Sequence, residues 1–388
     1  MNGILPDYAC KRSNAMKNTS SQQLVTDLFA SADVAINGSR PWDIQVKEDL
    51  FYKRLVAGGS KALGESYMDG WWECRQLDQF FDRILQVRID QKAKKSLTAL
   101  WCRTKAFLST SPGKFRAFEI GRRHYDIGNE LFSLMLDKWM NYSCAYWKKA
   151  RTLDEAQESK MELICRKLHL QPGMRVLDIG CGWGGLSAYI AEKYQAQVVG
   201  ITVSKEQVSL AEKRCQGLPV EIRLQDYRDL NESFDRIVSV GMFEHVGAGQ
   251  YRTFMEVVKR CLADQGLFLL HTIAGNRSVR WTDPWISTYI FPNSMVPSSS
   301  QVSAAAENLL VLEDWHNFGP DYDPTLMAWY RNFVENWHHL EPAYDSRFYR
   351  MWTYYLLACA GTFRARRNQL WQIVFSNNGV RPTYESVR

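Results

Sequence analysis

Short apolar runs alternate with mixed apolar and polar segments along most of the chain after residue 150. The runs predict seven strands, at residues 175–179, 197–201, 220–224, 234–240, 267–272, 309–315 and 370–375. The segments around them predict helices at residues 152–168, 186–193, 204–215, 251–262, 324–337 and 346–367. Two helices begin with a capping box, at Thr152–Glu155 and Ser204–Gln207. Strands that alternate with helices indicate an α/β fold with a mostly parallel sheet.

The pattern changes along the chain, and four parts are expected. They are a flexible N-terminus (1–20), a small N-terminal domain (21–87), a basic linker (88–123) and the α/β domain (124–388), which carries an aromatic, proline-broken insertion at 275–308. In the small domain we expect a helix near Leu24–Phe29, a strand and turn at Ala35–Gly38 and a turn-rich aromatic segment at Leu63–Glu73. Trp71 and Trp72 in that segment fit either core packing or contact with a lipid interface. The insertion fits a lid or the wall of an apolar pocket.

The overall composition is that of a globular protein without a membrane span. Hydrophobic residues make up 46% of the chain and charged residues 23%. No apolar run approaches the roughly 18 residues that cross a bilayer, and residues 1–21 lack an apolar signal region, so we expect a cytoplasmic protein. The nine cysteines include no C-x-x-C pair and the seven histidines show no ligand spacing, which argues against disulfides and against a metal site.

The basic linker concentrates positive charge. It holds ten Lys and Arg residues against Asp90 and Glu119, with apolar side chains between the charges. Its net charge is therefore +8, whereas that of the whole chain is +6. Such a segment is attracted to anionic surfaces, although a solvated helical hairpin would have the same composition. No nucleic-acid motif accompanies it, so phospholipid is the expected partner and nucleic acid is not.

The stretch Val176–Gly185 reads as a buried strand that breaks into a glycine-rich turn and then opens a helix. Its spacing, G-x-G-x-G-G, differs from the dinucleotide fingerprint, and no acidic residue follows the second strand, which argues against a nicotinamide-dependent oxidoreductase. Asp178, on the strand before the turn, could brace the loop or meet a polar ligand group. The turn by itself predicts only a nucleotide-like cradle.

Polar residues follow each of the next strands at the same point. Thr202 and Gln207 follow the second strand and Gln225 and Asp226 the third, while the later strands lead into the positions Glu244, His271 and Ile273. The carboxyl ends of parallel strands share one edge of a sheet, and ligands bind there. The sequence therefore predicts a binding site at this edge.

The motifs around these residues resemble a known family. Val176–Gly185 followed by Gly200–Ser204 looks like the donor-binding half of a class I S-adenosylmethionine methyltransferase. Further segments are similar to the cyclopropane-fatty-acyl-phospholipid synthase family, namely Gly64–Glu73, His124–Asn129, Tyr142–Trp147, Gly241–Gly247, Leu270–Ile273 and Tyr289–Asn293. The resemblance implies a Rossmann-like seven-stranded class I methyltransferase sheet (fold class α/β) with a small, lipid-associated N-terminal α+β domain.

The resemblance also implies an activity. A one-carbon unit of S-adenosylmethionine would be added to the cis double bond of an unsaturated phospholipid acyl chain, through a carbocation that bound bicarbonate deprotonates. A homodimer on the inner face of the membrane is implied as well. The alternatives are a lipid methyltransferase that makes a methyl-branched or methylene product, and a non-catalytic lipid-binding protein.

Site residues follow from the same resemblance, position by position. The implied bicarbonate pocket consists of Cys144, Glu244, His271, the backbone of Ile273, and Tyr322. The implied donor site consists of Tyr142, Ser143, Asp178, Gly180, Cys181, Gly182, Thr202, Gln207, Gln225 and Asp226. Cys359 matches a position that the family has been assigned as an active-site cysteine, but no base lies near it in sequence and the reaction needs no enzyme nucleophile. Cys144 could also be a small buried apolar residue, and Glu244 could cap a helix.

Overall fold

The computed structural model describes residues 21–87, 128–279 and 281–388. The expected flexible N-terminus and basic linker lie outside these described residues, as do residues 124–127 of the His124–Asn129 motif.

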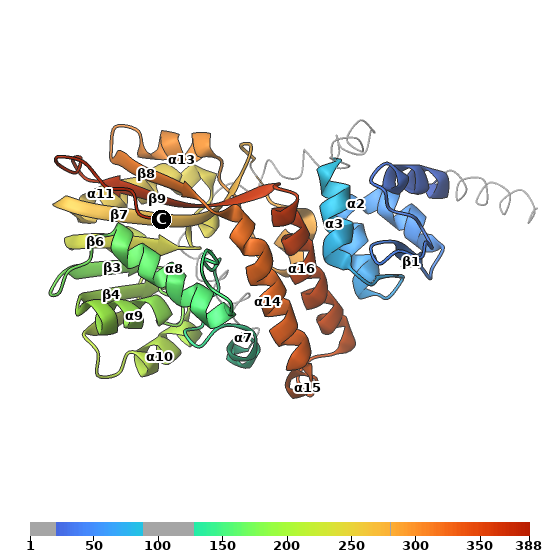
Figure 1. Cartoon of the computed structure of the whole chain (residues 1–388), viewed down its shortest axis with the longest axis horizontal. Coiled ribbons are helices and arrows are strands. Elements are labelled where there is room, and N and C mark those ends of the chain that lie inside the picture. Colours follow the sequence, from blue (N-terminus) through green and yellow to red (C-terminus); the bar gives the residue numbers. More distant parts are fainter. Residues whose placement is uncertain (1–20, 88–127, 280) are drawn as a thin grey trace, which may run out of the picture.

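A seven-stranded sheet forms the centre of the protein (Figure 1). Its spatial order is β5-β4-β3-β6-β7-β9-β8, and β9 is antiparallel to both of its neighbours whereas the other pairs are parallel. The strands are β3 (Arg175–Ile179), β4 (Gln197–Thr202), β5 (Val220–Leu224), β6 (Phe234–Val240), β7 (Leu262–Gly275), β8 (Val311–Asn317) and β9 (Asn368–Ser376). All seven predicted strands are confirmed, and the largest difference is at β7, which begins at Leu262 because that residue already pairs with Phe234.

Helices cover both faces of the sheet because successive strand residues point to opposite sides. Val176 of β3 packs in a cluster with α8 (Leu153–Lys167) and α9 (Gly185–Tyr194). Its neighbour Leu177 packs in a second cluster with α11 (Tyr251–Cys261) and α13 (Ser299–Ala306). Each capping box predicted for α8 and for α10 (Lys205–Arg214) is half present. The Thr152 and Ser204 hydroxyls accept hydrogen bonds from backbone N–H groups three residues later, but Glu155 accepts from the Arg151 N–H and Gln207 from the Thr202 hydroxyl instead of from the cap residue.

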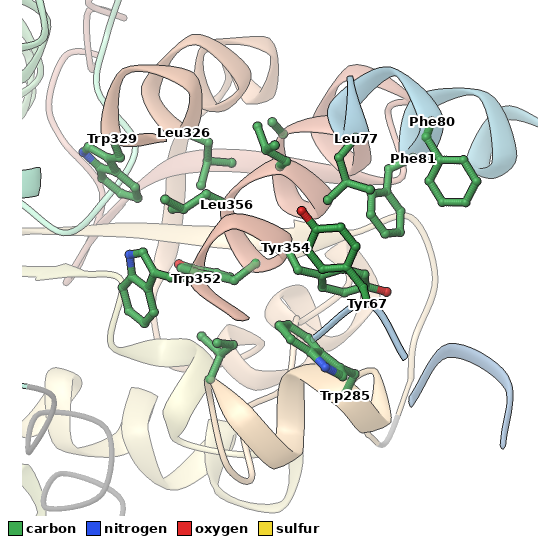
Figure 2. Packing of buried hydrophobic residues seen from close by; sticks show 14 of the residues in the cluster. Tyr67, Leu77, Phe80, Phe81, Trp285, Leu326, Trp329, Trp352, Tyr354 and Leu356 are labelled. Atoms are coloured by element: carbon green, nitrogen blue, oxygen red, sulfur yellow. The ribbon is translucent and has the colours of Figure 1, made fainter. Parts of the chain in front are cut away.

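The N-terminal part packs on a helical layer that stands at the ends of the strands (Figure 1). Figure 1 shows α14 (Tyr322–Glu335) and α16 (Ser346–Arg364) between the sheet and the helices α2 (Leu50–Met68) and α3 (Leu77–Gln86). Figure 2 shows the packing at this joint: Tyr354 of α16 lies among aromatic side chains, with ring centroids 5.1 Å from Phe81, 5.6 Å from Tyr67 and 4.5 Å from Trp285.

Two predictions for the N-terminal part are wrong. Ala35–Gly38 is not a strand, because it forms only an isolated bridge at Ile36, and the two strands are β1 (Ile44–Val46) and β2 (Trp72–Cys74). The segment Leu63–Glu73 is not turn-rich at its start, because α2 continues to Met68. A side chain at Gly64 would collide with the Trp285 indole, so glycine here serves close packing rather than a turn.

Trp72 is fully buried and its indole N–H donates to the Leu63 carbonyl, which supports core packing for this residue. The insertion contains α12 (Pro284–Tyr289) and α13, and Trp285 of α12 packs on α2. Among the described residues, no helix is long and apolar enough to cross a membrane.

Candidate active site

The glycine-rich turn after β3 forms the floor of the site. Gly180, Gly182 and Gly184 have φ values of 87°, 56° and 77°, which residues with a side chain rarely adopt. A Cβ at Gly180 would lie 2.8 Å from the Cβ of Met242, so a side chain is excluded there. The N–H groups of Gly180 and Cys181 both donate to the Ile201 carbonyl, which ties the turn to β4.

Asp178 points inward beneath the turn. It is 2% exposed and accepts a hydrogen bond of 2.8 Å from the Ser187 hydroxyl on α9. Burial raises the pKa of this carboxyl to about 6, and the Ser187 bond and the Lys160 ammonium oppose the rise. Of the two roles considered for Asp178, these contacts support bracing of the loop.

The polar residues after β4 and β5 lie together, as the strand order requires. The Thr202 hydroxyl donates to Gln207 Oε1 at 2.7 Å, and the Gln225 N–H donates to the Thr202 carbonyl at 3.0 Å. Asp226 is held by Arg228, whose Nε and Nη2 donate to the two carboxylate oxygens at 2.8 and 2.6 Å. A bond from an adenine amine to Asp226 would therefore have to share the carboxylate with Arg228.

The segment 141–147 lies beside the end of β6, where a Cβ on Gly241 would be 4.0 Å from the Ser143 Cβ, and it is anchored from two sides. On α8, Gln157 Nε2 donates to the Ser143 carbonyl at 2.9 Å, and the Lys160 ammonium donates to the Ser143 hydroxyl at 2.9 Å. On α14, the Thr325 hydroxyl accepts from the Ala145 N–H at 3.1 Å. These anchors hold Tyr142, Ser143 and Cys144 against the sheet edge.

Aromatic rings wall the space beside this segment. The Tyr142 ring centroid lies 5.1 Å from Phe132, 5.2 Å from Trp329 and 6.2 Å from Phe291 of the insertion. The hydroxyls of Tyr142 and Tyr355 are hydrogen-bonded at 2.8 Å. Such a wall excludes water and presents ring faces that stabilise a cation.

Glu244, after β6, is buried and only half satisfied. Its Oε1 accepts from the Ile273 N–H at 2.6 Å, whereas its Oε2 has no hydrogen-bond partner within the described part of the chain. Burial raises the pKa of Glu244 to about 7, although the Ile273 N–H opposes the rise. Its backbone carbonyl accepts from the Met295 N–H at 2.8 Å, so the insertion is fastened to this residue.

His271, on β7, is 1% exposed and has one nitrogen without a partner. The antiparallel register places it opposite Gln372 of β9, whose Nε2 lies 3.3 Å from His271 Nδ1. His271 Nε2 is buried and has no partner among the residues that the structure describes. Burial, reinforced by the Lys160 and Lys167 ammonium groups, lowers the pKa of His271 well below its usual range, so the imidazole is neutral.

Tyr322 lies near Cys144 and Cys359, and neither thiol is activated. The pKa of Tyr322 is raised by burial and further by the neighbouring Cys144, Tyr142, Glu244 and Cys359, which places these groups around one phenol. Burial raises the pKa of Cys359 to about 12 and that of Cys144 well above its usual range. A nucleophilic role for Cys359 therefore has no support, because a reactive thiol needs a lowered pKa.

Bicarbonate fits the pocket chemically. It carries an O–H that could donate to Glu244 Oε2 and oxygens that could accept from His271 Nε2, and these are buried atoms that lack partners in the described residues. Other contributors were not expected from the sequence. Gln157, Lys160 and Gln372 carry no motif, and only the inward face of a capped helix or of a strand could have suggested them.

The sheet and its glycine-rich edge have the fold of class I S-adenosylmethionine-dependent methyltransferases. Coclaurine N-methyltransferase, solved with SAH, shares the fold with a TM-score of 0.68 and 22% identity over 81% of this chain and 98% of that one. The sequence matches then narrow the class. The family model described as mycolic acid cyclopropane synthetase matches residues 113–373, and the chain belongs to this cyclopropane synthase family.

Two relatives within that family are close to the chain. The cyclopropane-fatty-acyl-phospholipid synthase of Escherichia coli is 53% identical, covering 92% of this chain and 95% of the relative. The mycolic acid cyclopropane synthase CmaA1, solved with SAH and CTAB, is 33% identical with a TM-score of 0.62, covering 66% of this chain and 97% of that one. The family resemblance that the motifs predicted is confirmed, and so is a cyclopropane-forming, S-adenosylmethionine-dependent activity.

Proposed function

We propose that this protein converts the cis double bond of an unsaturated phospholipid acyl chain into a cyclopropane ring, with S-adenosylmethionine as the donor and bicarbonate as the base. The observation that carries the proposal is the pair of unsatisfied buried atoms, Glu244 Oε2 and His271 Nε2, beside an aromatic wall at the end of the glycine-rich turn.

The proposed reaction accounts for both the aromatic wall and the unsatisfied polar atoms of the site. An alkene is a weak nucleophile, so the donor methyl must be held in line with it. When the alkene attacks the methyl carbon, the C–S bond breaks, S-adenosylhomocysteine leaves and a carbocation forms on the acyl chain. Loss of a proton from the new methyl group then lets its C–H electron pair close the ring. Bound bicarbonate would supply the base for this proton.

The described residues have separate tasks in this scheme. Tyr142, Phe291 and Trp329 exclude water and face the cation with their rings. Glu244 is fixed by the Ile273 N–H, which leaves Oε2 to orient the base or to take its proton. His271 stays neutral and can donate from Nε2, because Gln372 Nε2 donates to the other ring nitrogen.

Around the donor, we assign Gly180, Cys181, Gly182, Tyr142 and Ser143 to its amino-acid and ribose portions. The adenosine portion is assigned to Thr202, Gln207, Gln225 and Asp226, which lie at the ends of β4 and β5. The proposal also includes peripheral association with the inner face of the membrane, and a homodimer. Its phospholipid substrate is the one in the name of the E. coli relative, which matches over 92% of this chain.

The test is incubation of the protein with vesicles of a monounsaturated phospholipid and methyl-labelled S-adenosylmethionine, followed by mass analysis of the acyl chains. We expect one labelled carbon and two hydrogens to be added, with loss of the double bond. A labelled product that keeps a double bond, or that gains two further hydrogens, would identify the methylene or methyl-branched alternative. Unlabelled lipid would favour a binding protein.

Bicarbonate is tested separately in buffer freed of carbon dioxide. Ring formation should fall and return when bicarbonate is added, whereas binding of S-adenosylhomocysteine should not change. Full activity without bicarbonate would contradict this part of the proposal and leave the lipid assignment intact.

A further inference from the structure

A buried lysine lies beneath the site. Lys160 is 1% exposed and comes from the inward face of α8. Its ammonium donates to Ser143 Oγ and to Asn141 Oδ1, both at 2.9 Å. Burying a cation is costly, and a lysine fixed in this way generally serves a partner that needs its charge or its donors.

The neighbours of Lys160 include the polar groups of the site. Its pKa is lowered to about 8 by burial, and the charges of Asp137, Cys144 and Asp178 oppose the fall. The positive charge of Lys160 in turn lowers the pKa of His271. The ammonium thus lies below the donor segment and close enough to the base pocket to influence it.

The hydrogen bond to Ser143 has a direction. An ammonium has three N–H donors and no acceptor, so Ser143 Oγ must be the acceptor in this pair. The single O–H of the serine is then turned away from Lys160. A Cβ on Gly241 would lie 4.0 Å from the Ser143 Cβ, so this hydroxyl lies at the strand ends where the glycine-rich turn also opens.

We propose that Lys160 is a positioning residue for the methyl donor: it turns the Ser143 hydroxyl toward the carboxylate of S-adenosylmethionine and places a positive charge behind that anionic end. The inference rests on the proposed function, since it takes Ser143 as a contact of the donor. In this inference Lys160 does not contact the donor itself, but it fixes the direction in which the Ser143 hydroxyl donates.

The backbone around Ser143 supports a fixed geometry. Gln157, one turn before Lys160 on α8, donates to the carbonyls of Ser143 and Asn141 at 2.9 and 3.3 Å. Asp137 accepts from the Asn141 N–H at 2.8 Å. With the main chain held by these bonds, the loss of Lys160 should free the orientation of the hydroxyl more than the position of the segment.

The experiment measures ligand affinity by calorimetry on the full chain, with S-adenosylhomocysteine and 5′-methylthioadenosine as probes. The second probe lacks the amino-acid end. For Lys160→Met we expect the affinity for S-adenosylhomocysteine to fall about 10-fold or more, the effect of losing a charge-assisted hydrogen bond. The affinity for 5′-methylthioadenosine should stay within about twofold, because that ligand has no carboxylate to lose contact with.

A double-mutant cycle with Ser143→Ala asks whether Lys160 acts through the serine. The two losses should be clearly less than additive if they share one interaction. Additive losses, equal losses for both probes, or unchanged affinity for S-adenosylhomocysteine would each overturn the inference. If Lys160→Met does not fold, Lys160→Gln takes its place with the same expected selectivity between the probes.

Lys167→Met is the matched control. Lys167 is also fully buried on α8, but its ammonium faces Asp314 and His316, at 3.6 and 3.1 Å, so its loss should leave both affinities unchanged. Measurements on the native protein distinguish failure of this inference from failure of the proposed function. If the native protein binds S-adenosylhomocysteine but makes no ring product, the proposed function is wrong, and the affinities of the variants still decide the Lys160 inference.

Discussion

Glu244→Gln is expected to abolish ring formation while making the protein more stable at pH 8. The amide oxygen of glutamine can accept from the Ile273 N–H as Glu244 Oε1 does, so the fold around the residue is kept. The amide nitrogen would replace Oε2, and a hydrogen-bond donor would then stand where the pocket now offers an acceptor. On the proposed function, the site would lose the group that orients the base or takes its proton.

The size of both effects follows from the burial of this carboxyl. Loss of a positioned acid–base group in a buried site costs about 10²–10⁴-fold in rate. The pKa of Glu244 is raised from 4.5 to about 7, chiefly by burial. Because the folded pKa is the higher one, the stability it contributes is present below pH 4.5 and lost as the pH rises through 7. At pH 8 the ionised group therefore costs on the order of 3 kcal/mol, at about 1.4 kcal/mol per pH unit.

The assay combines product analysis, calorimetry with S-adenosylhomocysteine and thermal unfolding at pH 5 and pH 8. Glu244→Gln should bind the ligand with native affinity and melt several degrees higher than the native protein at pH 8, with a smaller difference at pH 5. Glu256→Gln on the exposed face of α11 is the control, and it should change neither activity nor stability. Substantial ring formation by Glu244→Gln would refute the role of the carboxylate, and a variant that is less stable at pH 8 would refute the burial argument.

Three further predictions test other parts of the molecule. Gly180→Ala should weaken binding of S-adenosylhomocysteine, measured by calorimetry, by about 10-fold or more, because both the φ of 87° and the nearby Met242 oppose a side chain. Gly217 also has a positive φ but lies in open space, so Gly217→Ala should leave this affinity unchanged. Cys359→Ala should keep kcat within about threefold in the product assay, since the thiol is protonated, and inactivity would restore a catalytic role. Binding to anionic vesicles in sedimentation should weaken between about 50 and 500 mM salt if the basic segment 88–123 carries it, and a salt-independent affinity would count against that segment.

The sheet was the most predictable part of the protein. A buried parallel strand reads as an apolar run, and each run from Arg175 onward lies in a strand. The order of the strands, with β9 inserted between β7 and β8, depends on contacts between distant residues and was not predicted. The N-terminal part was predicted less well, because Gly64 reads as a turn residue and its actual role, making room for Trp285 some 220 residues later, is not visible locally.

For the site, the motifs predicted which residues take part but not the hydrogen bonds that hold those residues in place. Glu244 and Ile273 were expected in one pocket, and the hydrogen bond between them joins the two motifs directly. Lys160 and Gln372 were not expected, because Lys160 lies outside the motifs that precede it and Gln372 becomes a neighbour of His271 only through strand pairing. Asp178 was considered as a possible ligand contact, but its bond to Ser187 supports the bracing role.

Burial sets the charge state of the ionisable groups of the site. It keeps His271 and Tyr322 uncharged, whereas it raises the pKa of Glu244 only to about 7, so this carboxyl still carries part of a negative charge at neutral pH. An anion that entered the site would need a compensating charge, and the nearby Lys160 ammonium, which lowers the pKa of His271, is a candidate for it. On the proposed function, a cation that formed on the acyl chain would face the rings around Tyr142. Because bicarbonate would supply the base, no side chain of the protein would need to act as a nucleophile.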